Sequence, residues 1–524
     1  MPAKIDKVVI SNFAALKDKY GSRGLRAIRA AVARLIAADK GRGLNTVLVD
    51  VDSKAKMKSL SAARVIDHRN CRQNKEAIDG VYKALMPDYI MILGSRDVIP
   101  HQDMKNPLFT KRNGDDPDQF AWGDLPYACD APYSKSPNDF TGPTRVVGRL
   151  PDITGGSDHG YLVGLLKTAS EYKRVEHDAL KEHFAISAQV WQVSTKRTLR
   201  AIFRTDRTLQ NVPPQNERWK ADLIKRRIHL FNCHGAHNSS RFYGQPMNKR
   251  RQPAFPTSLD ATFMDGKIGE GTIVAAECCY GGQLYALSSV QPRLGMTNVY
   301  LKNRSYAFFG STTIAYGPAR NNGQADLICR FFIQSILDGA SLGRAVLEAR
   351  QKFARHAGTM DPTDFKTLAQ FNLYGDPSIT PLREDSVRAA AVQPAFAVDR
   401  EERHERRRML ALEGSALQDS VPRIRKSSSR PSAAVMRALH EYAKRPGLKK
   451  MEVLSFSVQW PAGTRAMSLL AARKRTPDAA YHVALTAQTH RVQDADEPAI
   501  RVISGVMVKE VDGKPVSVSE IQSR

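Results

Sequence analysis

Two hydrophobic patterns alternate along the first 384 residues: short continuous apolar runs, and longer segments with apolar residues at helical spacing. Runs such as TVLVDVD (46–52) and DYIMILG (88–94) are typical of strands that are covered on both faces. Segment 13–43 has helical spacing in its second half and ends in glycines just before a strand. This alternation predicts an α/β fold with a mainly parallel sheet and helices on both faces.

The same patterns predict the remaining elements of this region. Further strands are expected at 145–149, 185–193, 227–233, 272–278 and 305–311, and helices at 74–86, 157–177, 196–205, 323–338, 341–356 and 362–371. A long segment, 95–143, is rich in Asp, Pro and Asn and predicts a loop. Loops of this length inside a compact domain are usually functional or mobile.

The pattern changes after about residue 384. Segment 385–448 carries a charged run at 399–408 and a Ser-rich patch at 426–434, which predict a charged helix and a flexible linker. Residues 449–524 alternate between apolar and polar residues like strands, and Asp512-Gly513 is typical of a hairpin turn. We therefore expect a small β-rich C-terminal module.

These boundaries predict three parts of the chain. The first, 1–384, contains an N-terminal subdomain of about 1–155 and a catalytic subdomain of about 156–384. The charged linker and the β-rich module follow. A chain of 524 residues with 42% hydrophobic residues is long enough for several cores.

The charge and the cysteine content limit which binding partners and which cellular compartment we expect. The chain has 79 Lys and Arg against 53 Asp and Glu, a net charge of +26. A nucleic-acid partner is therefore possible, but solvated helix faces and the charged linker account for much of the excess. The first residues have no apolar signal region and no run approaches a membrane span, so we expect a cytoplasmic protein without a membrane partner. The six cysteines have no metal or disulfide spacing, and we expect neither a metal nor a cofactor.

Two apolar runs end in residues that can perform chemistry. FNCHGAH (231–237) carries His234, and TIVAAECCYGG (272–282) carries Cys278 and Cys279. The ends of neighbouring parallel strands lie side by side at one sheet edge, so the imidazole and a thiol are expected to meet there. An imidazole that accepts the thiol proton creates a nucleophile and later protonates a leaving amine.

Glycines beside these residues favour acyl transfer. The backbone N–H groups of Gly235 and Cys279 are the expected donors to a developing oxyanion. Strand alternation sends the side chains of Cys278 and Cys279 in opposite directions, so one of them is expected to pack in the core. The residues alone also allow a simpler reading, in which His234 caps a loop and both cysteines are small core residues.

An ordered set of motifs resembles the gingipain family of cysteine peptidases, within the caspase-like clan. The set is YIMILGSRDVIP (89–100), DLPYACD (124–130), TRVVGRLPD (144–152), NCHGAH (232–237), AAECCYGG (275–282), AFFGSTTIAYG (307–317) and FNLYGDPSI (371–379). The spacing from His234 to Cys279, 279 − 234 = 45 residues, is close to the roughly 50 of caspases. The resemblance covers roughly 85–382.

This resemblance implies a caspase-like three-layer α/β sandwich that hydrolyses peptide bonds through a thioester. It maps the nucleophile onto Cys279 and the family's His-Gly onto His234-Gly235. The family's Glu that orients the histidine falls near 190–196, where this chain has no carboxylate, so we expect a dyad. His237 is a weaker candidate base because no glycine follows it.

Substrate recognition is less defined by the sequence. Tyr316, Arg197, Arg320 and Asp326 are the candidate substrate-binding residues. Asp326 would pair with a basic side chain of the substrate, whereas Arg197 or Arg320 would pair with an acidic one, and all three are also consistent with ordinary surface charges.

The function expected from the sequence is an intracellular cysteine endopeptidase. It would cleave selected protein substrates and would be regulated, for example by an activating protein partner. One alternative is a catalytically silent caspase-like scaffold that binds protein or nucleic acid through its basic surface. Another is an acyltransferase with the same dyad, because the thioester is common to both reactions.

Overall fold

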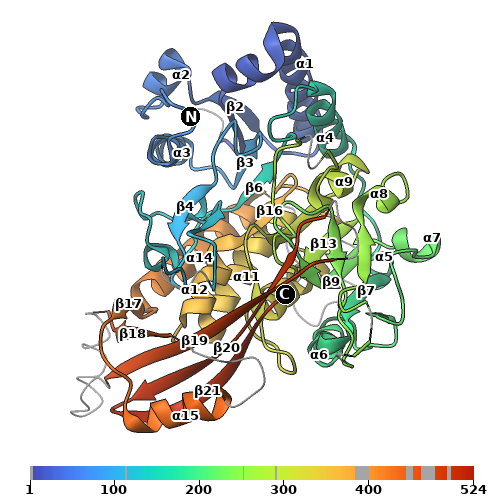
Figure 1. Cartoon of the computed structure of the whole chain (residues 1–524). Coiled ribbons are helices and arrows are strands. Elements are labelled where there is room, and N and C mark those ends of the chain that lie inside the picture. Colours follow the sequence, from blue (N-terminus) through green and yellow to red (C-terminus); the bar gives the residue numbers. More distant parts are fainter. Residues whose placement is uncertain are drawn as a thin grey trace.

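The architecture is built on a ten-stranded central sheet in a computed structural model (Figure 1). The structure describes residues 4–111, 115–248, 250–251, 253–288, 292–383, 400–443, 452–461, 478–492 and 497–524. In spatial order the strands are β2 (Thr46–Asp50), β1 (Lys7–Ser11), β3 (Tyr89–Leu93), β6 (Val147–Leu150), β16 (Phe371–Tyr374), β14 (Ala307–Ser311), β13 (Ile273–Ala276), β9 (Ile228–Asn232), β7 (His183–Ala188) and β8 (Leu209–Val212).

The pairing of these strands is parallel at every step except one. β14 and β16 pair antiparallel, with Phe308 opposite Tyr374. The sheet therefore consists of two parallel halves that run in opposite directions and meet at this pair. The mainly parallel α/β sheet predicted from the sequence is confirmed, whereas strands β1, β8 and β16 were not predicted. Of these, β16 joins the two halves through its pairing with β14.

Helices cover both faces of the sheet, as the continuous apolar strands require. Side chains of β13 alternate between two cores, with Val274 and Ala276 in one and Ile273 and Ala275 in the other. The first core contains residues of α1 (Phe13–Gly41), α3 (Cys71–Leu85), α4 (His159–Glu171) and α9 (Met296–Lys302). The second contains residues of α10 (Gln324–Leu337), α11 (Leu342–Ala357) and α12 (Pro362–Gln370).

Smaller elements lie in the connections. The predicted loop 95–143 contains the antiparallel pair β4 (Gln102–Lys105) and β5 (Phe120–Gly123). The other short elements are α2 (Lys54–Ser59), α5 (His177–Lys181), α6 (Gln192–Phe203), α7 (Ala221–Ile224), α8 (Ala261–Met264), β10 (His234–Gly235), β11 (Arg241–Tyr243) and β12 (Thr257–Asp260).

A separate antiparallel sheet forms the C-terminal part of the chain, in agreement with the predicted β-rich module. Its spatial order is β15 (Tyr316–Gly317), β21 (Lys514–Ser523), β20 (Ile500–Val511), β19 (Ala479–His490), β18 (Val453–Gln459) and β17 (Arg423–Ser427). β20 and β21 are joined at Asp512-Gly513, where both residues have positive φ. The predicted hairpin turn is confirmed.

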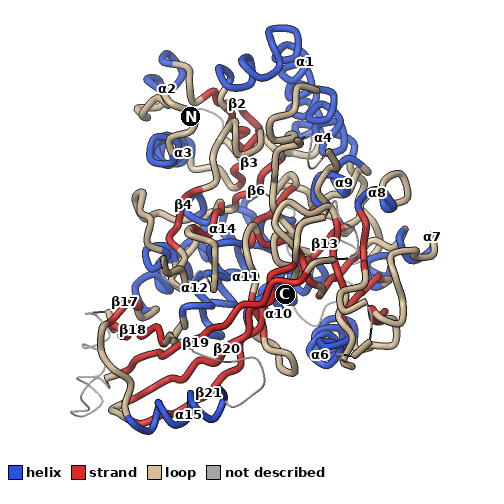
Figure 2. The backbone as a smooth tube through the Cα atoms, in the orientation of Figure 1, coloured by secondary structure: helices blue, strands red, loops and turns tan. Residues whose placement is uncertain are grey.

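The edges of this sheet come from outside the predicted module. β15 belongs to the α/β body, and β17 comes from the segment predicted as a linker. In that segment α14 (Arg400–Ser420) packs on α11 and α15 (Ala433–Ala443) packs on β20, while 385–399 and 444–448 lie outside the described residues. Figures 1 and 2 show that the long strands run from one end of the molecule to its centre, where the C-terminus lies.

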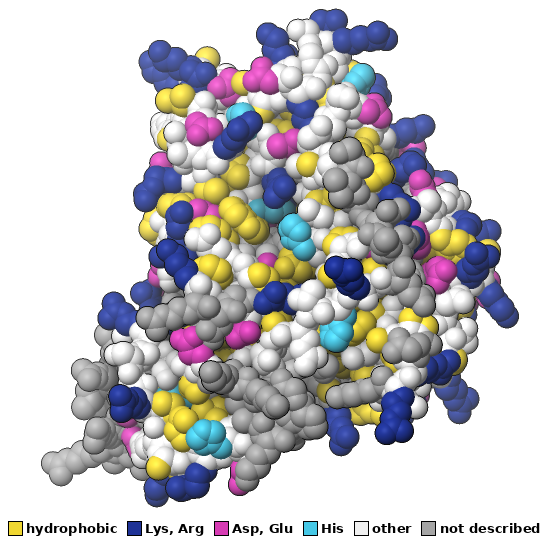
Figure 3. Space-filling model, in the orientation of Figure 1, with side chains coloured by type: hydrophobic (Ala, Val, Ile, Leu, Met, Phe, Trp, Pro, Cys, Tyr) yellow, Lys and Arg dark blue, Asp and Glu magenta, His cyan; other side chains and the backbone are white. Residues whose placement is uncertain are grey.

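The distribution of surface charge and the length of the apolar helices are relevant to nucleic-acid and membrane partners. On the face shown in Figure 3, Lys and Arg side chains are spread around the outline and between acidic and apolar side chains. No helix in the described part of the chain combines the length and the apolar character needed to cross a membrane.

A buried lysine links β1 to the second half of the chain. Lys7 is fully buried, and its Nζ lies 3.0 Å from a carboxylate oxygen of Asp39 and also contacts Asp376. Burial alone would lower the pKa of Lys7, but Asp376 and Asp39 raise it above its ordinary value, so the ammonium stays charged. One cation thus holds two buried carboxylates in place.

Replacing this lysine tests its contribution to stability. We expect Lys7→Met to lower the apparent free energy of unfolding by about 3–5 kcal/mol, because two buried carboxylates lose their partner. Urea unfolding followed by fluorescence measures the change. Lys17→Met, on the exposed side of α1, is the matched control and should stay within about 0.5 kcal/mol of wild type. Equal effects of the two changes would contradict this role.

Candidate active site

The structure places His234 and Cys279 beyond the ends of two neighbouring parallel strands. β9 and β13 pair parallel, with Phe231 opposite Ala276. The backbones touch at this point, since a Cβ added to Gly235 would lie 1.8 Å from the carbonyl oxygen of Cys279. Only glycine permits this approach, and it brings the two chain segments together.

The two adjacent cysteines point to opposite sides. Cys278 belongs to the core of the first sheet face, and its Sγ lies 3.8 Å from the carbonyl oxygen of Phe231. Cys279 belongs to the opposite side, where the N–H of Ala315 donates to its Sγ at 3.3 Å. Tyr280 follows with a φ of 55°, a left-handed conformation that turns the chain sharply after the thiol.

Aromatic rings and one amide fix the imidazole of His234. Its ring centroid lies 4.4 Å from that of Trp191 and 5.2 Å from that of Phe255. Its Nε2 lies 2.9 Å from Oε1 of Gln245, while its buried Nδ1 has no hydrogen-bond partner among the described residues. A proton on Nε2, donated to this amide oxygen, leaves the Nδ1 lone pair to accept another.

Gln245 was not predicted. The resemblance implied a carboxylate near 190–196, whereas the residue that holds the imidazole is an amide in the loop after β11. Backbone hydrogen bonds fix this loop, because Gln245 donates to Val212 at 3.1 Å and accepts from Val190 at 3.2 Å. A single Gln in a loop has no spacing pattern that would reveal it.

Burial keeps both candidate reactive groups neutral. It lowers the pKa of His234 to about 4; the bond to Gln245 opposes this shift, and the charge of Arg524 adds to it. Burial also raises the pKa of the Cys279 thiol to about 12, opposed by a hydrogen bond from the Ala315 backbone. In this state the site holds a thiol and a neutral imidazole.

The backbone of β21 runs directly past these two groups. Ser523 is paired with Tyr316 and Gln522 with Gly317, in antiparallel register. Beyond them the N–H of Arg524 donates to the carbonyl oxygen of Ala315 at 3.0 Å. The N–H of Cys279 lies 3.4 Å from the carbonyl oxygen of Arg524. A main-chain carbonyl oxygen, that of Arg524, therefore lies beside the candidate nucleophile.

The side chain of Arg524 enters a closed pocket. It is fully buried, and its Nη2 lies 2.7 Å from Oδ2 of Asp326 and 3.0 Å from the carbonyl oxygen of Pro318. Its guanidinium lies 4.7 Å from the ring centroid of Trp191. Asp326, one of the predicted substrate-binding residues, is thus at the base of this pocket.

The other predicted substrate-binding residues lie elsewhere. Tyr316 is buried; its backbone pairs with β21, and its hydroxyl donates to Asp116. Arg197 is exposed and bonds to Asn321, and Arg320 is exposed at a cleft of about 760 Å³ between the loop 318–324 and β21. The structure therefore does not bring Arg197 or Arg320 to the buried pocket. His237, the weaker candidate base, is also exposed and contacts Tyr280 edge to face at 5.3 Å.

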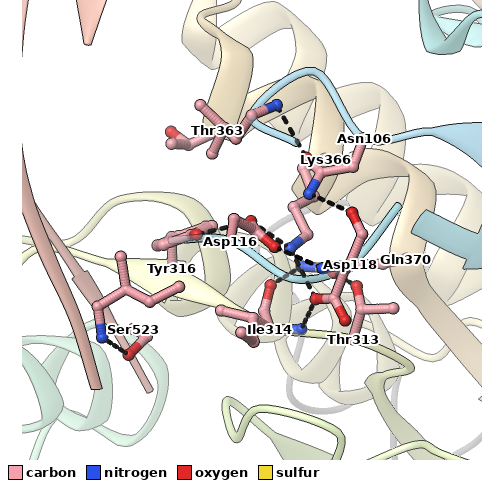
Figure 4. Close-up of polar contacts among 12 residues, drawn as sticks. Asn106, Asp116, Asp118, Thr313, Ile314, Tyr316, Thr363, Lys366, Gln370 and Ser523 are labelled. Carbon is pink, nitrogen blue, oxygen red and sulfur yellow. Dashed lines mark hydrogen bonds and ion pairs between the residues drawn. The ribbon is translucent and has the colours of Figure 1, made fainter. Parts of the chain in front are cut away.

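A buried ionic cluster supports the chain segment around β15. Lys366 Nζ lies 2.7 Å from Asp116 and 3.0 Å from Asp118, and Figure 4 shows these side chains converging. Asp116 accepts from the hydroxyl of Tyr316, and Asp118 accepts from the backbone N–H of Ile314. The long loop 95–143, predicted to be functional or mobile, thus fixes the strand against which β21 lies.

A possible metal-binding group lies away from this site. Among the described residues, Asp6, Asp88 and His404 have ligand atoms close enough to share one ion. The carboxylates already have cationic partners, because Arg400 lies 3.1 Å from Asp6 and Arg407 lies 3.4 Å from Asp88. This cluster attaches α14 to the α/β body.

Comparisons with known proteins add little to this geometry. No family model matches the chain, and no curated protein matches it. One solved structure, described as "Structure of Protease", aligns with 99% of this chain and 97% of its own, with a TM-score of 0.45 and 12% identity. A similarity of this degree carries no argument about activity.

The close approach at Gly235 can be tested directly. We expect Gly235→Ala to displace the Cys279 backbone and to cost about 1–3 kcal/mol of stability, as overpacking does. Thermal unfolding measures this change. Gly164→Ala, where nothing lies within 4 Å of the added Cβ, should be neutral or stabilising because alanine favours the helix. A Gly235→Ala protein as stable as wild type would contradict the contact.

Proposed function

We propose that this protein is a cysteine endopeptidase in which Cys279 is the nucleophile and His234 is the general base. The observation that carries the proposal is the position of the Arg524 carbonyl, 3.4 Å from the N–H of Cys279 and beside the imidazole. A peptide bond in this position would present its carbonyl carbon to the thiol. The resemblance to gingipains remains a prediction from sequence motifs.

The proposed reaction uses groups that the site already holds. His234 Nδ1 accepts the thiol proton as Sγ of Cys279 bonds to the carbonyl carbon. The proton then passes to the leaving amine as the C–N bond breaks, which leaves a thioester. Water, deprotonated by the same imidazole, hydrolyses the thioester and restores the thiol.

The backbone N–H of Cys279 is the proposed donor to the oxyanion, since it already faces a carbonyl oxygen. A role for Gly235 at the oxyanion is supported by steric evidence, because its missing side chain lets its backbone lie against Cys279. Its N–H stays a second proposed donor. Gln245 is proposed as a positioning residue, because it holds Nε2 and leaves Nδ1 directed to the reaction.

Selected protein substrates, a cytoplasmic setting and an activating protein partner also remain proposals. The buried thiol is consistent with an enzyme that requires activation. The alternatives of a silent scaffold, of nucleic-acid binding through the +26 surplus and of acyl transfer have no further observation in their favour.

The two cysteines provide a matched pair for testing the nucleophile. We expect Cys279→Ala to lower the cleavage of a pooled fluorogenic peptide library by roughly 10³-fold or more, as losing the nucleophile of such an enzyme does. Cys278→Ala should retain cleavage because this thiol packs in the core on the other side. His234→Ala should match Cys279→Ala. Loss in Cys278→Ala alone, with both proteins folded, would reverse the assignment.

Gln245 can be tested through the pH dependence of the same cleavage. We expect Gln245→Leu to lower kcat/KM at least tenfold, because the imidazole loses its fixed orientation. Gln245→Glu should move the acid limb of the profile to higher pH, since a carboxylate raises the pKa of the imidazole and only the neutral base accepts a proton. A merely structural glutamine would lower activity without moving this limb.

A further inference from the structure

The last residues of β21 lie in the arrangement of a bound peptide substrate. Ser523 and Gln522 extend the two-residue strand β15 by antiparallel pairing, and Arg524 continues the pairing to Ala315. Addition of an extended peptide to an exposed strand is a common mode of peptide recognition. The turn and the first part of β21, residues 512–520, are exposed, so only residues 521–524 enter the site.

The pocket that receives Arg524 binds its guanidinium through one nitrogen and one aromatic face: Nη2 pairs with Asp326, whereas the buried Nε and Nη1 have no hydrogen-bond partner among the described residues. Two buried acidic side chains, Asp326 and Glu277, lie near it. Burial and the neighbouring Asp326 raise the pKa of Glu277 well above its usual value, which favours its protonated form. Asp326 is the carboxylate that pairs with the guanidinium, at 2.7 Å. Trp191 offers a flat ring on which a planar cation stacks.

Other side chains would be less well matched to this pocket. A carboxylate would lie beside Asp326 and lose the favourable charge. An apolar side chain would leave the buried Asp326 without a cationic partner, with only Asn232 and the backbone of Gly323 donating to it at 3.4 Å, which is costly in a closed environment. A lysine supplies a charge but not the plane that stacks on Trp191.

We propose that this pocket selects arginine before the scissile bond, an inference that rests on the proposed function. We further propose that β21 occupies the pocket as a tethered substrate mimic. Arg524 fills the specificity pocket, and its carbonyl lies at the position of the scissile carbonyl. The strand covers the reactive groups, since Cys279 is 1% exposed and His234 is fully buried. Catalysis then requires β21 to leave.

Attachment through β20 makes the strand a strong competitor. An occupant on the same chain has an effective concentration that short flexible linkers raise to the millimolar range, above most substrate concentrations. The pairing of β20 with β21 along most of their length holds the strand in register. A partner that binds the exposed part of β21 would free the site without touching the dyad.

Alkylation of Cys279 by iodoacetamide tests occupancy independently of catalysis. We expect Arg524→Ala and Arg524→Glu to raise the alkylation rate of Cys279 at least tenfold over wild type, measured by peptide mass spectrometry. Lys514→Ala, at the exposed far end of β21, is the control and should match wild type. Unchanged rates in both Arg524 variants, with folding verified by circular dichroism, would overturn the occupancy.

Peptides added in trans test the specificity of the pocket. In Arg524→Ala, the peptide acetyl-Glu-Ile-Gln-Ser-Arg should restore protection of Cys279, whereas the same peptide ending in Asp or Leu should not. Adding Asp326→Asn to this variant should weaken protection by the arginine peptide at least tenfold. Equal protection by all three peptides would overturn the arginine pocket.

Fluorogenic substrates that differ only in the residue before the cleaved amide complete the test. We expect Arg524→Ala to cleave the arginine substrate at least tenfold faster than wild type and faster than the lysine, aspartate or leucine substrates. Selective protection without any cleavage would support the pocket and contradict the proposed peptidase. Cleavage after aspartate or leucine would support a peptidase and contradict the arginine pocket.

Discussion

The parallel pairing of β9 and β13 is the constraint on which the rest of the site depends. Both strands end at the same edge of the sheet, so the residues that follow them must share one small volume. Gly235 then allows the two backbones to touch. A larger residue at this position would separate the imidazole from the thiol, however well the rest of the sheet formed.

Much of this arrangement could be predicted because it is periodic. Continuous apolar runs locate β3, β9, β13 and β14, and the alternation of side chains explains why Cys278 and Cys279 face opposite sides. Asp326 also emerged from the sequence as a partner for a basic side chain. The sequence predicted that Asp326 lies near the start of a helix, but it did not predict that Arg524 is its cationic partner.

The remaining features depend on contacts between distant parts of the chain. Gln245 reaches His234 from a loop, and Lys366 meets Asp116 across 250 residues. Strand β1 has only three apolar residues in a row, and polar residues interrupt the apolar ones in β8 and β16. The antiparallel pairing of β14 with β16 depends on contacts between distant segments and not on a local pattern. The largest omission was β21, which was correctly expected as a strand but without its place in the site.

Trp191 connects the two halves of the site physically. Its ring lies against the imidazole of His234 on one side and beneath the guanidinium of Arg524 on the other, and its Nε1 donates to Gln522 at 3.0 Å. An occupant of the pocket therefore changes the environment of the base: it excludes water and places a positive charge nearby, and both effects lower the pKa of His234. In the proposed function, a substrate arginine in the same pocket would shift this pKa in the same direction and so lower the basicity of the imidazole. Binding at the pocket and the basicity of His234 would then be coupled, because a single aromatic side chain contacts both groups.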